Sequence, residues 1–136
     1  MRYRAELDDD GELLISAAED DDEWFDFYRH LSYDAHSVEQ AGELLLDEGF
    51  DPPTEWTRVR DQRAAIVYKS ALTPDLIARR IARVEDVRHA NDQAHSAEDE
   101  LLADVLNAIA SGHPEPAELA REALKVRDVK FTRYYA

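Results

Sequence analysis

The stretch that decides the fold is Arg2–Ala17, with the sequence RYRAELDDDGELLISA. Charged and apolar side chains alternate over residues 2–7, which is the period of a half-buried strand. Asp10-Gly11 is a strong turn signal for a hairpin. We therefore predict a β-hairpin with strands at 2–7 and 12–17 and a tip crowded with carboxylates.

Three further segments have strand character. Residues 55–60 alternate and residues 64–69 are rich in strand-forming side chains, so they predict a second hairpin that turns at Asp61-Gln62-Arg63. Residues 128–135 predict a last strand, able to pair with a hairpin and close the sheet.

Helical periodicity appears in four places. Residues 20–31 begin with four acids and continue with a wide apolar face, which predicts an amphipathic helix. Residues 37–48 predict a second helix, with Ser37 and Gln40 as a capping box and Gly49 at its end. Residues 74–111 predict one long helix, or two that fold back near 91–96, and residues 116–126 a short one.

This order of elements predicts an α+β fold. We expect an antiparallel sheet built from the two β-hairpins and the C-terminal strand, with the helices, including the long or broken one at about 74–111, packed on one face. No internal repeat or linker is visible, so a single domain over residues 1–136 is expected.

The charge of the chain is unevenly distributed. The net charge is −15, and residues 1–55 hold 18 acidic and three basic side chains, whereas residues 56–136 hold 13 of each. Residues 5–28 contain 11 acids and no base. Salt adaptation would acidify the whole surface, so it does not explain this asymmetry. A local purpose for the acids and simple solubility or chance are the two remaining interpretations.

Several classes of function lack their sequence signatures. The chain has no cysteine, which excludes disulfides, thiolate metal sites and cysteine nucleophiles. Its four glycines are too far apart for a phosphate-binding loop, and no serine lies in a nucleophile-elbow motif. We expect no cofactor and no enzymatic activity. With no apolar run long enough for a membrane span and no signal peptide, we expect a cytoplasmic protein without membrane contact.

The segment richest in metal-binding residue types is 89–99. On a continuous helix, Asp92, His95 and Asp99 would share a face and offer nitrogen and oxygen ligands to a divalent cation. A solvated face or a helix–helix turn explains the same residues, so no metal site is favoured. A small metal-dependent hydrolase using this carboxylate and histidine site stays open as an alternative function.

The acidity leads to our main expectation, a non-enzymatic module that docks on a basic surface of another protein. Its specific form is a DNA mimic that inhibits a nucleic-acid-binding protein, of the kind encoded by phages or mobile elements. Direct binding of nucleic acid is not expected, because phosphates would repel the chain. A structural or oligomerisation domain, such as a homodimer, is the other alternative. The expected acidic face consists of Asp8, Asp9, Asp10, Glu12, Glu19, Asp20, Asp21, Asp22, Glu23 and Asp26.

Overall fold

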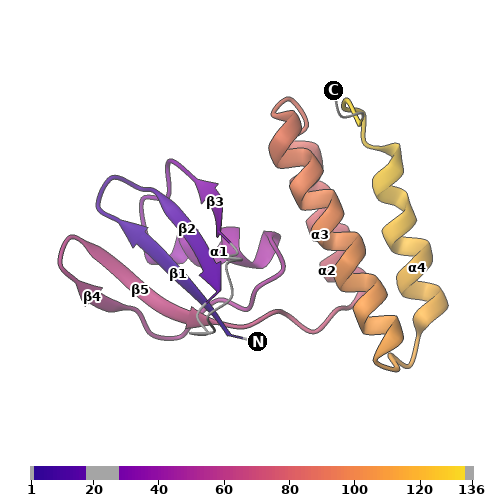
Figure 1. The fold of residues 1–136 in the computed structure, drawn as a ribbon, viewed down its shortest axis with the longest axis horizontal. Coiled ribbons are helices and arrows are strands. Elements are labelled where there is room, and N and C mark those ends of the chain that lie inside the picture. The colour runs from indigo at the N-terminus through magenta and orange to yellow at the C-terminus, as the bar shows by residue number, and fades with distance from the viewer. Residues whose placement is uncertain (1, 18–27, 134–136) are drawn as a thin grey trace. The chain divides into compact units, whose positions relative to one another are not determined.

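The computed structural model describes residues 2–17 and 28–133. The fold is α+β, as predicted. The chain forms two compact units, which we call unit 1 (Met1–Ser70) and unit 2 (Ala71–Ala136). Each has its own hydrophobic core. Unit 1 contains the β-sheet and one helix, and unit 2 contains the other helices (Figure 1). The expectation of a single cooperative domain stays a prediction, which an unfolding experiment described below tests.

The sheet of unit 1 has five antiparallel strands in the order β3-β2-β1-β5-β4. The N-terminal hairpin is confirmed, and its first strand lies at the centre of the sheet. Arg60 and Asp61 form the turn of the second hairpin, one residue earlier than predicted, and Arg60 adopts a φ of 61°. The strands are β1 (Tyr3–Asp8), β2 (Leu13–Ala17), β3 (Tyr28–Ser32), β4 (Thr57–Val59) and β5 (Gln62–Val67).

The fifth strand is not the one predicted. Residues 28–31, expected at the end of a helix, belong to β3, which pairs with β2. Residues 20–27 lie outside the described part of the chain. The predicted C-terminal strand at 128–135 is wrong over its described residues: a 3-10 turn (Lys125–Asp128) is followed by irregular chain to residue 133. The alternation of side chains gave this wrong prediction, because an irregular extended segment that packs on helices can show the same alternation as a β-strand.

Helix α1 (Val38–Asp47) covers one face of the sheet and has the predicted caps. Ser37 Oγ accepts a hydrogen bond from Gln40 N at 3.1 Å, and Gln40 Oε1 accepts one from His36 N at 2.9 Å. At the other end Gly49 has a φ of 96°, and Phe50 N donates to Leu45 O at 2.9 Å. This is a Schellman motif, in which Leu45 and Phe50 are both buried. This helix end places Phe50 in the core of unit 1.

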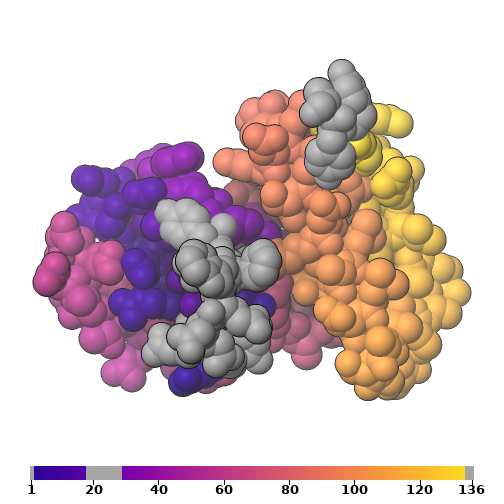
Figure 2. Space-filling view, viewed as in Figure 1, coloured from indigo at the N-terminus to yellow at the C-terminus, as the bar shows by residue number. Residues whose placement is uncertain are grey.

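Unit 2 is a bundle of α2 (Pro74–Asp86), α3 (Asn91–Ala110) and α4 (Pro116–Leu124). The long apolar stripe is therefore broken into two helices that pack on each other, as the broken alternative predicted. The break lies at 87–90, and residues 91–96, where it was expected, belong to α3. Figure 2 shows the orange surface of α3 in contact with the yellow surface of α4. His113 Nδ1 accepts from Glu115 N at 3.0 Å and its Nε2 donates to Leu72 O at 3.2 Å, which ties the α3–α4 loop to the start of α2.

Two ion pairs lie inside this bundle. Arg80 on α2 is buried and donates to Asp104 on α3 at 2.8 Å. Glu98 on α3 is 3% exposed and accepts from Nε of Arg133 with both oxygens, at 3.1 and 3.2 Å. The second pair holds the irregular C-terminal segment against α3.

Candidate functional site

The first hairpin tip was expected to present a free cluster of carboxylates, and the structure shows local roles for two of them. Asp8 Oδ1 accepts from Asp10 N at 3.0 Å and from Glu12 N at 2.8 Å, so this side chain holds the turn. An aspartate that hydrogen-bonds its own following backbone is a common turn device. Asp10 is exposed.

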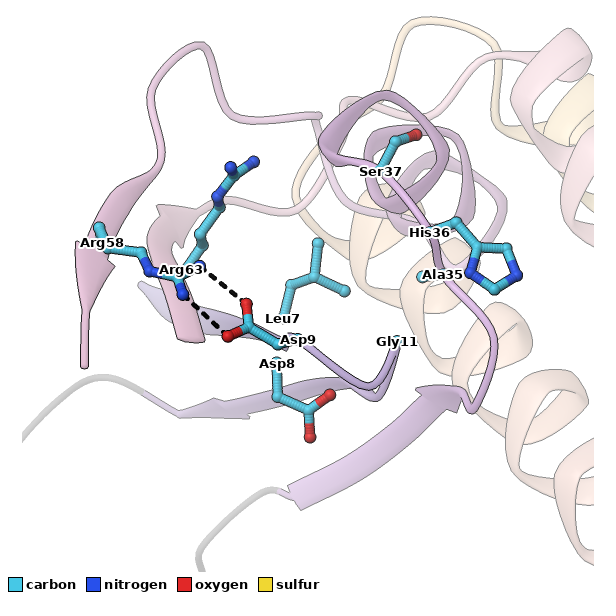
Figure 3. A pocket seen from close by; sticks show the side chains of 9 residues that line it. All are labelled: Leu7, Asp8, Asp9, Gly11, Ala35, His36, Ser37, Arg58 and Arg63. Atoms are coloured by element: carbon cyan, nitrogen blue, oxygen red, sulfur yellow. Dashed lines mark hydrogen bonds and ion pairs between the residues drawn. The ribbon is translucent and has the colours of Figure 1, made fainter. Parts of the chain in front are cut away.

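Asp9 joins the two hairpins. Its carboxylate forms a bidentate ion pair with the Arg58 guanidinium, both contacts at 2.8 Å, and its N–H donates to Asp61 O at 3.2 Å (Figure 3). The hydrogen bonds and charge of Arg58 lower the pKa of Asp9 below its usual value. Arg58, from the stretch 56–136 that has as many bases as acids, therefore neutralises an acid of the base-poor stretch 1–55.

A polar pocket of about 180 Å³ opens beside this pair, between the hairpins and the start of α1. Asp8, Asp9, Arg58 and Arg63 line it, together with Ser37 at the helix N-terminus. The two carboxylates balance the two guanidinium groups, so the pocket has no excess charge with which to attract an ionic ligand.

Glu12 faces a half-buried histidine on the neighbouring strand. Its Oε1 lies 3.7 Å from Nε2 of His30, whose ring stacks on Tyr33 with centroids 3.6 Å apart. Burial lowers the pKa of His30, while the charges of Glu12 and Asp8 act in the opposite direction. Among the described residues, neither ring nitrogen of His30 has a hydrogen-bond partner.

The remaining expected members of the acidic face lie outside the described residues. They are Glu19, Asp20, Asp21, Asp22, Glu23 and Asp26.

The structure adds an acidic surface that the sequence reasoning missed. Glu39, Glu43 and Asp47 follow one another at i, i+4 and i+8 along α1, opposite the face that packs on the sheet. Glu39 and Glu43 are exposed and Asp47 is half-buried. We call these three residues the α1 stripe. The four-residue spacing with no basic residue in the helix was the available signal.

The charge asymmetry follows the two units. Unit 1 contains 19 acidic and seven basic side chains, a net charge of −12, and unit 2 contains 12 and nine, a net charge of −3. Some of the bases in unit 1 serve internal pairs. Arg29 on β3 pairs with the buried Glu48 at the end of α1, and Arg4 pairs with Glu6 at 2.8 Å. The acidity is therefore a property of the sheet-containing unit.

The metal-site candidates do not converge within the described residues. No group of three or more histidine, aspartate or glutamate side chains there could hold a metal ion. His95 packs its ring edge-on against Phe131, with centroids 5.1 Å apart. Asp92 and Asp99 are exposed on α3.

Comparison with known protein families, with characterised proteins and with solved structures finds no match to this chain. Among the described residues, no helix has the length and apolar character needed to cross a membrane.

Proposed function

We propose that the chain is a non-enzymatic interaction module, and that unit 1 docks through its acidic surface on a basic surface of another protein. The α1 stripe is the observation that carries this proposal. Its three carboxylates lie on the outer side of a helix that contains no base. Like charges four residues apart disfavour a helix, and docking on a basic surface would offset this cost.

The charge of unit 1 supports the same proposal at longer range. A net charge of −12 on 70 residues attracts a basic surface over about one Debye length, roughly 8 Å at physiological salt. Complementary charge of this kind mainly raises the association rate and selects the partner. The proposed setting is the cytoplasm, which suits a chain without disulfides.

A DNA mimic is the more specific form of this proposal. Positions four residues apart in a helix are separated by about 6 Å along its axis, whereas one DNA strand carries a phosphate about every 3.4 Å. The α1 stripe therefore has about half the negative charge per unit length of one DNA strand. Competition between DNA and this protein for the same basic surface distinguishes mimicry from ordinary docking.

The test compares two triple variants that remove the same charge. E39Q/E43Q/D47N neutralises the α1 stripe, and D92N/E118Q/D128N neutralises three exposed acids of unit 2. Partners captured from host lysate by the wild type should be lost by the first variant and kept by the second. They should also dissociate as salt is raised from about 50 to about 500 mM, because screening shortens the reach of charge. Equal capture by both variants would refute the role of the stripe.

A further inference from the structure

A groove of about 350 Å³ lies on unit 1, where the chain entering β4 separates from β5. At one end of the groove these two segments pair with each other, β4 with residues 62–64 of β5. At the other end Phe50 forms a bridge with Lys69, and Asp51 N donates to Tyr68 O at 2.9 Å. Between these points residues 51–55 form one wall, and Pro52 and Pro53 in this wall lack the N–H needed to continue a ladder.

The floor of the groove is an exposed apolar surface. Ile66 is 44% exposed and Tyr68 is 52% exposed, although both lie on or next to β5. A second hollow of about 280 Å³ adjoins it, shares Ile66 and Glu55, and is lined further along by Val59. Residues 65–68 span about 10 Å of extended chain, so the groove has room for about three residues of another extended chain.

The charge at the rim indicates what the groove would accept. Asp51 and Glu55 both line the groove and are exposed, and its described lining residues include no base. Arg4 lines the adjoining hollow, where it pairs with Glu6 at 2.8 Å. The two carboxylates of the groove lie in a unit whose net charge is −12. An extended segment with apolar side chains beside lysine or arginine matches both the floor and the rim. An acidic segment, or the same face of a second copy, would place like charges together.

We propose that this groove binds a short extended segment of a partner protein in which apolar residues alternate with basic ones. The proposal rests on the proposed function, since it assigns part of the same basic partner to a second contact on unit 1. The alternation follows from strand geometry: successive side chains of an extended chain point to opposite sides, so apolar groups meet Ile66 and Tyr68 while basic groups reach Asp51 and Glu55.

The test uses three fluorescein-labelled peptides. In the first, valine or leucine alternates with arginine; in the second, glutamate replaces arginine; in the third, serine replaces the apolar residues. Fluorescence anisotropy with the full chain should detect binding of the first peptide only. I66T, which keeps a strand-forming residue, and D51N/E55Q should each weaken binding about tenfold. The controls D34N/D61N and L106Q, which change exposed residues outside the groove, should bind within about twofold of the wild type.

Three outcomes would overturn the groove proposal. One is equal binding of the glutamate peptide. Another is loss of binding in E39Q/E43Q/D47N with no loss in I66T, which would place the peptide on the α1 stripe and leave the proposed function intact. The third is concentration-dependent light scattering that I66T abolishes, which would make a second copy the occupant. If instead the peptide binds the groove and host partners bind the stripe variant as well as they bind the wild type, the proposed function fails while the groove stands.

Discussion

The pair between Glu98 and Arg133 gives a stability prediction that the structure makes quantitative. In R133M the carboxylate of Glu98, 3% exposed, loses both of its close contacts. Its nearest remaining base is Arg127, at 3.9 Å on an exposed side chain. Arg133 also donates to Val126 O at 3.0 Å and lies 4.0 Å from the centroid of the Phe131 ring, so the substitution loosens the whole C-terminal segment.

The magnitude follows from the burial of the pair. Removing one partner of a fully buried ion pair costs about 3–5 kcal/mol. The side chain of Arg133 is 21% exposed and Arg127 stays nearby, so we expect about 2–3 kcal/mol for R133M. Unit 2 has 66 residues, for which the total stability is roughly 3–10 kcal/mol. The substitution should therefore remove about a third of it.

Urea unfolding measures this loss, and the sequence provides a separate probe for each unit. Both tryptophans, Trp24 and Trp56, belong to unit 1, whereas most of the helix belongs to unit 2. Circular dichroism at 222 nm should show R133M unfolding about 1–2 M earlier in urea than the wild type. E98L/R133M should recover most of the loss, because an apolar pair leaves no buried charge behind.

An R133M midpoint within about 0.3 M of the wild type would show that Glu98 is solvated or paired differently, and the reasoning would be wrong. The same experiment tests the single-domain prediction. If fluorescence and circular dichroism shift together in R133M, the two units unfold as one cooperative domain; if only the helical signal shifts, they unfold separately.

Three further predictions concern unit 1. The pKa of His30 is lower in the folded than in the unfolded state, so the unfolded state takes up the proton first and the free energy of unfolding should fall as pH drops below about 6.5. H30F should flatten that part of the pH dependence of the urea midpoint, measured by fluorescence. An unchanged slope in H30F would contradict this role of His30. G11A should destabilise unit 1 by about 2 kcal/mol, because φ of Gly11 is 92° and an added Cβ would lie 3.1 Å from Ala35 N. A loss below about 0.5 kcal/mol in the same urea titration would mean that the turn relaxes to accommodate the methyl group. S37A should lower the free energy of unfolding by about 1 kcal/mol, because it removes the N-cap of α1. S37D restores a hydrogen-bond acceptor and should recover most of this loss in thermal unfolding. Equal melting temperatures for S37A and the wild type would argue against this cap.

Local sequence signals predicted the elements whose ends are fixed by short-range chemistry. The turn at Asp10-Gly11 and the Ser37 and Gln40 cap both hold, because each depends on backbone positions within a few residues. The same reasoning failed at 28–31 and 128–133. There the outcome depends on long-range pairing with β2 and on the buried Glu98, which no local pattern reveals.

The candidate site was only partly predictable for the same reason. Counting acids identified the charged part of the chain, but the partner of Asp9 is Arg58, 49 residues away. The α1 stripe could have been found from the spacing of Glu39, Glu43 and Asp47, since the helix itself was predicted. The groove at Ile66 could not, because it arises where two paired segments separate.

The most direct test of acidic docking is the salt dependence of one captured partner, measured with the wild type, E39Q/E43Q/D47N and the matched D92N/E118Q/D128N. The account predicts that affinity for the wild type and the unit 2 variant falls steeply and in parallel with salt. The stripe variant should start weaker and fall less steeply, because fewer charges are screened. Equal affinities and equal salt slopes for all three proteins would contradict it.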